Sequence, residues 1–181
     1  RGRLVVKLLV VITGQVDSGK TTKLNALCSR MDTLGLQIGG ITQTVPIPGI
    51  KKNDYLISDL STGIVKTLMS VHETPGWLRR GRFWIDSSVF DWANDAIEHT
   101  MATSDVLAFD EIGPIELEGW GMAKSFNQVI HSFNGIIITA IRSALLDQIA
   151  TTFKLAIGKG IVADSTTSIE ALYASVLQRL E

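Results

Sequence analysis

A glycine-rich segment, GQVDSGKTT, spans Gly14 to Thr22 and directly follows the apolar run LLVVIT. The continuous run predicts a strand buried on both faces, as in parallel sheets, because a half-exposed strand would alternate polar and apolar residues. Gly14 and Gly19 allow a tight turn in which successive backbone N–H groups face inward. Together with the N-terminus of a following helix, these donors form a concave anion site. The segment therefore predicts a phosphate-binding loop.

The spacing within this loop indicates the kind of phosphate. Gly14 to Thr21 match G-x-x-x-x-G-K-[ST], in which the lysine reaches the β- and γ-phosphates and the hydroxyl residue binds Mg²⁺. These roles fall on Lys20 and Thr21, and the expected ligand is ATP or another nucleoside triphosphate. Thr22 either contacts the α-phosphate or begins the helix. The predicted nucleotide-binding residues are Gly14, Gln15, Val16, Asp17, Ser18, Gly19, Lys20, Thr21 and Thr22.

A pair of acids follows a second buried strand, in the segment DVLAFDEIG. In nucleotide-binding proteins with such a glycine loop, an acidic residue at the end of a neighbouring strand helps to hold Mg²⁺. We expect Asp110 to do so together with Thr21. Glu111 is then placed to orient and deprotonate the water that attacks the γ-phosphate. On their own the two acids would be read as a solvated strand end. Beside the glycine loop they predict a P-loop nucleotide-binding protein.

Strands alternate with helices of ten to fifteen residues, which predicts an α/β fold around a mostly parallel sheet. Residues 1–181 contain no repeat or linker, so one domain is expected. A capping box at Ser88 and Asp91 predicts the start of one helix. The remaining expected elements are helices over 19–34, 88–101 and 169–180, strands over 37–44, 135–141 and 159–163, an antiparallel hairpin over 55–70, and an Arg- and Trp-rich loop over 74–86 that runs into a strand.

The composition of the chain argues against nucleic acid and membranes as partners. The formal net charge of −1 gives no sequence-wide positive field for nucleic acid or an anionic membrane. The longest apolar run is too short to span a bilayer, so no membrane partner is expected and a cytoplasmic location is predicted. The single cysteine, Cys28, excludes an internal disulfide. It recurs at helical spacing with Leu24, Leu27 and Met31, which predicts a core position.

Several segments together resemble the cancer-related nucleoside-triphosphatase family of small P-loop enzymes. They are GKTT, GGIT, the Gly81-Arg82-Phe83 element and DEIGPIELEG, and they extend the resemblance from Gly14 to about Glu116. The resemblance implies a RecA-like three-layer sandwich with helices on both faces of the sheet and an added β-hairpin. It also implies slow hydrolysis of several nucleoside triphosphates with little base selectivity. The loop GQVDSGKTT and Pro114 depart from the family pattern, which indicates a divergent member.

Arginines in two places are candidates for contacting the γ-phosphate. Arg82 falls on the family's Gly-Arg-aromatic element, and a catalytic role in stabilising transition-state charge is predicted for it. Arg79 and Arg80, in the same segment, are expected to be solvated. Arg142 follows the strand GIIITAI at the edge where ligands of open α/β sheets bind. It either senses phosphate or is an ordinary loop arginine.

Other polar and aromatic residues have weaker claims. Trp77 and Trp120 stand beside glycines and could stack on a base, although packing is their commoner role. Glu116 is the last acid of the family pattern and is expected at the rim of the site. The three histidines share no metal-ligand spacing.

Three functions are compatible with these motifs. The first is Mg²⁺-dependent hydrolysis of a nucleoside triphosphate to the diphosphate and phosphate. The second is a small kinase, although the segment after the acid pair, IGPIELEGWGMAKSF, lacks the arginine that kinase lids often carry. The third is a nucleotide-gated module with little turnover, in which the hairpin at Tyr55 to Ser70 would contact a protein partner. No guanine-reading N-K-x-D segment occurs, so a Ras-like GTPase is not expected.

Overall fold

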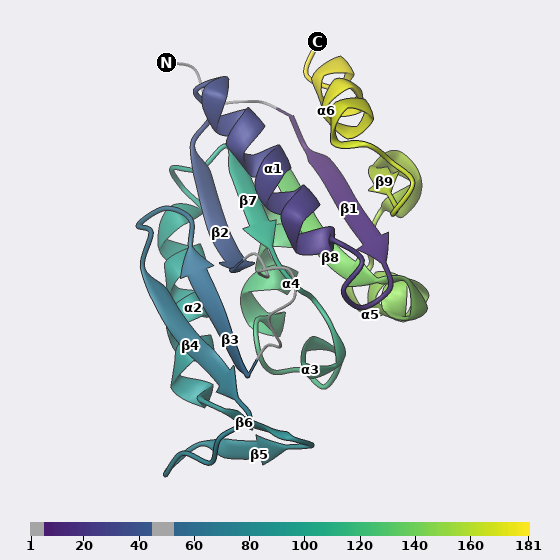
Figure 1. Ribbon diagram of the computed structural model, residues 1–181. Helices are drawn as coiled ribbons and strands as arrows, with labels where there is room; N and C mark the ends of the chain where they lie inside the picture. Colours follow the sequence, from purple (N-terminus) through teal and green to yellow (C-terminus); the bar gives the residue numbers. More distant parts are fainter. Residues whose placement is uncertain (1–5, 45–52) are drawn as a thin grey trace.

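Parallel pairing of strands organises the centre of the molecule (Figure 1). The structure is a computed structural model that describes residues 6–44 and 53–181. Because neighbouring central strands run in the same direction, their carboxyl ends lie at one edge of the sheet. The parallel strands follow the order β2 (Ile38–Gln43), β7 (Val106–Phe109), β8 (Ile136–Arg142), β1 (Leu8–Gly14) and β9 (Ile161–Ala163).

Antiparallel strands extend this sheet beyond β2. They follow the order β3 (Asp54–Asp59), β4 (Val65–Ser70), β6 (Phe83–Ile85) and β5 (Leu78–Arg80). The hairpin expected over 55–70 is confirmed as β3–β4. The strand expected at the end of the Arg- and Trp-rich segment is confirmed as β6. The loop expected before it is wrong in part, because β5 lies there and pairs with β6 as a second hairpin. Gly81 makes that turn possible with a φ of +61°, which few other residues adopt.

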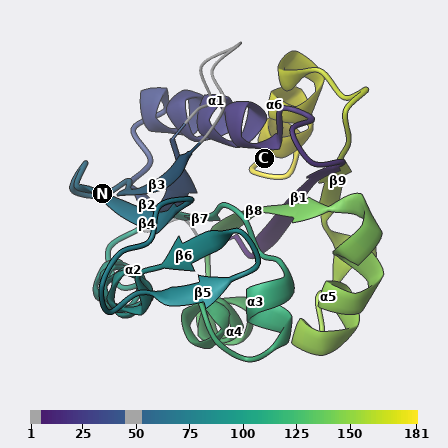
Figure 2. The same ribbon diagram turned by 60° about the horizontal axis from the view of Figure 1, so that its bottom comes forward.

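Helices cover both faces of the sheet, and the three layers are plain in Figure 2. One face carries α1 (Lys20–Thr33) and α6 (Ile169–Gln178). The other carries α2 (Ser87–Thr100), α4 (Ala123–Ser132) and α5 (Leu146–Phe153). The short helices are α3 (Pro114–Leu117), η1 (Ser143–Leu145) and η2 (Ile157–Lys159). The predicted three-layer sandwich is therefore confirmed. In the described part of the chain, no helix has both the length and the apolar character needed to cross a bilayer.

The apolar run of β1 supplies two separate cores. Successive strand side chains point to opposite faces, so Val11 packs towards α2, α4 and α5 while Val10 and Ile12 pack towards α1 and α6. This explains why the run shows no alternation of polar residues. Cys28 lies in the second core with 5% of its surface exposed, and burial raises the pKa of its thiol to about 12. Its predicted core position is confirmed.

Some helix boundaries differ from the sequence-based expectations. The predicted capping box at Ser88 is wrong: α2 begins at Ser87, and the Asp86 carboxylate caps it by accepting from the Ser88 N–H at 3.0 Å. Asp86 serves because a short carboxylate just before a helix reaches its unpaired amides. The closing helix ends at Gln178 rather than Leu180. Helices α4 and α5 were not anticipated from the sequence.

Gly40 on β2 provides a test of how closely the central strands approach. It pairs with Ala108 on β7 and has a φ of +112°. A Cβ atom there would overlap the backbone oxygen and nitrogen of Ala108. We expect Gly40→Ala to lower the free energy of unfolding by about 2 kcal/mol or more, measured by urea denaturation, because backbone atoms cannot move aside cheaply.

Gly158→Ala is the matched control, because a Cβ atom at Gly158 would have no heavy atom within 4 Å. We expect this change to alter the free energy of unfolding by less than about 0.5 kcal/mol. Equal effects of the two substitutions would contradict the proposed steric role of Gly40.

Candidate nucleotide-binding site

The glycine loop connects β1 to α1 and needs its two motif glycines for different reasons. Gly19 is the N-cap of α1 and has a φ of +83°, in the left-handed region. This conformation turns the chain into the helix, whose first-turn N–H groups lack partners within the helix. At Gly14 a Cβ atom would overlap the Oγ atom of Ser18. The two glycines therefore permit a loop that is tightly closed and rich in available donors.

The Lys20 side chain lies against the backbone of the glycine loop. The Lys20 side chain is only 6% exposed, and its Nζ atom donates to the Gln15 carbonyl at 2.5 Å. Gln15, Val16 and Asp17 form the exposed tip of the loop, and Asp17 has a φ of +56°. Ser18 has a buried Oγ without a hydrogen-bond partner in the described structure. Thr21 is half-buried and Thr22 exposed, and both lie in the first turn of α1.

The acid pair meets this loop at the carboxyl edge of the sheet. Asp110 follows β7 and Gly14 ends β1, but the two strands are not adjacent, because β8 lies between them. The expectation that the acids follow the strand next to the loop is therefore wrong by one strand. Arg142, the last residue of β8, pairs in register with Gly14 and occupies the intervening position.

Asp110 is buried in a way that fits a cation ligand. Its side chain is 1% exposed, Oδ2 accepts from the Gln43 N–H at 3.2 Å, and Oδ1 has no hydrogen-bond partner in the described structure. Burial raises the pKa of Asp110 to about 6, against the opposing effects of the Thr21 hydroxyl, the Gln43 amide and Lys20. A divalent cation bound to Asp110 would give Oδ1 a partner, and its positive charge would balance the negative charge of the buried carboxylate.

Few protein ligands are needed for such a cation. Among the described residues, no group of three or more His, Cys, Asp or Glu side chains is arranged to hold a metal. Mg²⁺ usually keeps several waters and binds through one or two protein groups plus substrate phosphates. Asp110 and the Thr21 hydroxyl therefore form a donor set that fits Mg²⁺ together with a nucleotide.

Glu111 and Arg142 form an ion pair at the same edge. The Arg142 Nε–H donates to Glu111 Oε1 at 2.7 Å. Exposure is 18% for the Glu111 side chain and 41% for that of Arg142. The sequence left Arg142 either as a phosphate sensor or as an ordinary loop arginine. The structure brings it to Glu111, the predicted general base.

Comparison with known proteins shows the family of this chain. Residues 9–159 match the family model described as NTPase. The chain belongs to this NTPase family. It is similar to the nucleoside-triphosphatase THEP1 of Methanothermobacter thermautotrophicus, with 31% identity over 141 residues, or 77% of this chain and 79% of that protein. THEP1 of Pyrococcus abyssi is 29% identical over 132 residues, or 72% of this chain and 73% of the relative.

Solved structures agree with the fold of this nucleoside-triphosphatase. The crystal structure of THEP1 from the hyperthermophile Aquifex aeolicus has a TM-score of 0.73 at 20% identity, covering 96% of this chain and 99% of that one. The solution structure of a human cancer-related nucleoside triphosphatase has a TM-score of 0.71 at 19% identity, covering 97% and 98%. The family resemblance and the P-loop fold predicted from the sequence are thus confirmed.

Glu116 of this nucleoside-triphosphatase does not lie at the rim of the site. It is 4% exposed, and its carboxylate accepts from the Gly113 N–H at 2.9 Å and the Met122 N–H at 3.2 Å. Burial raises its pKa, against the effect of these hydrogen bonds. Glu116 therefore ties the start of α3 at Gly113 to the start of α4 at Met122 and fixes the segment that follows Glu111. The expectation of a rim position is wrong.

The arginines of the second hairpin lie apart from the glycine loop. Arg82 is exposed, with its guanidinium 4.6 Å from the centre of the Phe83 ring. Arg80 pairs with Glu118 and lies over Trp120. In the described part of the chain, no hydrogen bond or ion pair joins Arg82 to the loop or to the acid pair. Its catalytic role stays a prediction, whereas Arg142 is the arginine that the structure places beside Glu111.

The two candidate base-stacking tryptophans differ in their surroundings. Trp120 is half-buried and packs edge-on against Phe90, with ring centres 5.7 Å apart. This contact supports packing as its role. Trp77 is also half-buried and precedes β5.

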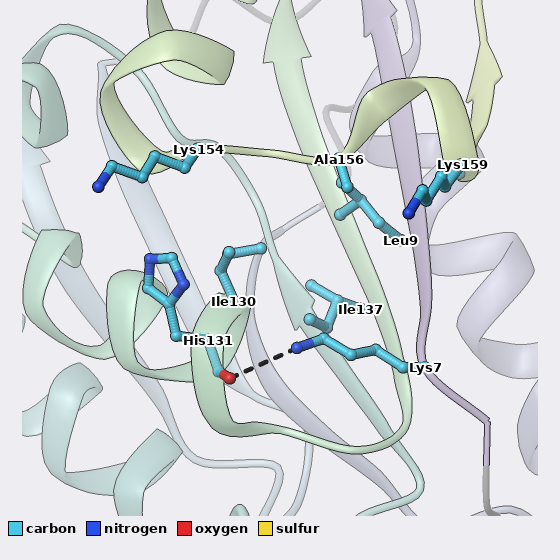
Figure 3. Close-up of a pocket in the computed structure, with 9 residues that line it drawn as sticks. Lys7, Leu9, Ile130, His131, Ile137, Lys154, Ala156 and Lys159 are labelled. Atoms are coloured by element: carbon cyan, nitrogen blue, oxygen red, sulfur yellow. Dashed lines mark hydrogen bonds between the residues drawn. The ribbon is translucent and has the colours of Figure 1, made fainter.

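A separate pocket of about 320 Å³ lies at the opposite ends of β1 and β8 (Figure 3). Lys7 precedes β1 there and donates from Nζ to the His131 carbonyl at 3.4 Å. His131 lies in the last turn of α4, and Lys154 caps the end of α5. Cationic groups at helix C-termini offset the negative end of the helix dipole. Lys7 and Lys154 therefore lie at the C-terminal ends of α4 and α5, and the pocket is distinct from the nucleotide site.

The clamp formed by Glu116 can be tested by removing one acceptor oxygen. We expect Glu116→Gln to lower the free energy of unfolding by about 1–3 kcal/mol, because one buried backbone N–H loses its partner. Urea denaturation measures the change. Glu118→Gln is the control, because Glu118 is exposed and solvent screens its pair with Arg80, so we expect a much smaller change. A similar loss in both variants would contradict the clamp.

Proposed function

We propose that this nucleoside-triphosphatase requires Mg²⁺ and releases the γ-phosphate of ATP and other nucleoside triphosphates by attack of water. The convergence of the glycine loop, the buried Asp110 and Glu111 on one edge of the sheet is the observation that supports these roles. The reaction yields the nucleoside diphosphate and inorganic phosphate.

Phosphate binding falls to the loop and Lys20. The first-turn amides of α1 and the loop amides donate to phosphate oxygens, and the helix N-terminus adds a partial positive charge. The Lys20 ammonium, which lies against the Gln15 carbonyl, would turn to the β- and γ-phosphates when they enter the loop. This exchange would replace one neutral acceptor with a charged one.

Asp110 and Thr21 would hold the metal ion. When bound, Mg²⁺ would neutralise charge on the β- and γ-phosphate oxygens and so favour departure of the diphosphate. The unpartnered Asp110 Oδ1 supports its assignment as a ligand oxygen.

Glu111 would accept the proton of the attacking water. The water oxygen forms a bond to the γ-phosphorus while the bridging bond to the β-phosphate oxygen breaks, and the electron pair leaves with the diphosphate. The proton is held on the Glu111 carboxylate until product release. The remaining 18% exposure of this side chain leaves it accessible to a water molecule.

Broad base selectivity is part of the proposal. The elements assembled at this edge address phosphates and a metal ion, which all nucleoside triphosphates share, and the family resemblance points the same way. We expect phosphate release from ATP, GTP, CTP and UTP at rates within about one order of magnitude. A phosphate-release assay on the full chain measures this, and chelation of Mg²⁺ should abolish release from all four. Transfer to an added acceptor with no free phosphate would favour a kinase instead.

Substitution of the proposed base should separate binding from turnover. We expect Glu111→Gln to lower kcat by about 10²–10⁴-fold, because the water loses its proton acceptor. Nucleotide affinity should be at least as strong as in the parent. Phosphate release and isothermal titration calorimetry measure the two quantities, with Glu118→Gln as the exposed control. Parental turnover in Glu111→Gln would refute the role of Glu111.

Substitution of the proposed metal ligand should act through the metal requirement. We expect Asp110→Asn to raise the Mg²⁺ concentration for half-maximal phosphate release about tenfold or more, because a charged ligand oxygen becomes neutral. A magnesium titration at saturating nucleotide measures the shift, and circular dichroism verifies folding. An unchanged Mg²⁺ dependence in a folded variant would exclude Asp110 as a ligand.

A further inference from the structure

Arg142 occupies a position from which it can reach both halves of the site. It ends β8, the strand between the glycine loop on β1 and the acid pair after β7. Its Cα is the register partner of Gly14, the first residue of the loop. Its side chain is 41% exposed at the carboxyl edge of the sheet, the edge where the phosphates would lie.

The ion pair with Glu111 uses one part of the guanidinium. The 2.7 Å bond is made by Nε, and an arginine has further N–H donors on its two terminal nitrogens. Arginine binds phosphate and carboxylate through the same planar fork. Arg142 is therefore chemically able to exchange a carboxylate partner for a phosphate partner by a small movement of the side chain.

The same pair restrains the proposed base. An oxygen of Glu111 that accepts from Arg142 is less available to accept from water. A γ-phosphate entering the loop brings more negative charge than a single carboxylate, so it competes for the guanidinium. A nucleoside diphosphate lacks this group and offers no such competition at the same place.

We propose that Arg142 is a sensor of the γ-phosphate. Without a triphosphate it holds Glu111, and a bound triphosphate draws the guanidinium away and frees Glu111 for the attacking water. This inference rests on the proposed function, because it assigns Glu111 as the base. The site thereby distinguishes triphosphate from diphosphate before hydrolysis begins.

The first experiment compares two nucleotides in Arg142→Ala. Calorimetry with Mg²⁺ measures the affinity for ADP and for a non-hydrolysable β,γ-imido ATP analogue. We expect about tenfold weaker binding of the analogue, since a hydrogen bond between charged groups is lost, and ADP binding within about twofold of the parent. Arg142→Lys should recover part of the lost affinity. Equal changes for both nucleotides, or no change for either, would overturn the proposal.

The second experiment asks whether Glu111 competes with phosphate for Arg142. Glu111→Gln should tighten analogue binding when Arg142 is present, because the competing carboxylate is gone. The same change made in Arg142→Ala should give no such gain. Equal tightening in both backgrounds would show that the two residues act independently and would overturn the proposal. Thermal melting of every variant establishes that it is folded.

Controls separate this inference from the role of Glu111 as the base. Arg80→Ala removes another Arg–Glu pair, with Glu118, remote from the loop, and should alter neither affinity. Loss of turnover in Glu111→Gln tests the base, whereas the binding cycle involves no hydrolysis. A parental rate in Glu111→Gln with an intact binding cycle would refute the base alone. A lost cycle with lost turnover would refute the sensor alone.

Discussion

Parallel pairing of β1, β8 and β7 is the constraint on which the site depends. These strands are apolar on both faces, so each must lie between two helical layers, and their crossovers send every strand in the same direction. The residues that follow them are therefore delivered to one edge. The loop after β1, the arginine at the end of β8 and the acids after β7 therefore come together. Gly14 and Arg142 meet in this way although more than a hundred residues separate them in the sequence.

The buried carboxylates of Glu116 and Asp110 differ in how many of their oxygens have hydrogen-bond partners. Glu116 has both oxygens engaged by backbone N–H groups, so its burial is compensated and its role is to fix a loop. Asp110 is equally withdrawn from water, yet one of its oxygens lacks a partner. A buried polar atom left unsatisfied is costly for the protein alone. Its retention is understandable where a cation arrives with the substrate.

Local patterns in the sequence were sufficient for the loop and the acid pair, because both are defined by short spacings beside apolar strands. The hairpin β3–β4 was equally accessible from its turn residues. The position of β8 between β1 and β7 was not, because strand order is set by contacts among distant segments. The same reason hid the pairing of Arg142 with Glu111 and the burial of Glu116. Helix α4 carries a local signal in the sequence, because Phe126, Val129 and Ile130 recur at helical spacing.

The outermost strands of the sheet also affect how readily the protein would aggregate at high concentration. Within the described residues the sheet terminates in β5 and β9, and each is three residues long. Unpaired edges can recruit strands from other molecules, and short or charged edges discourage this. β5 exposes Leu78 but continues with two arginines, and β9 has little backbone to offer. The architecture that concentrates chemistry at one end of the strands thus leaves its flanks poorly suited to seeding aggregates.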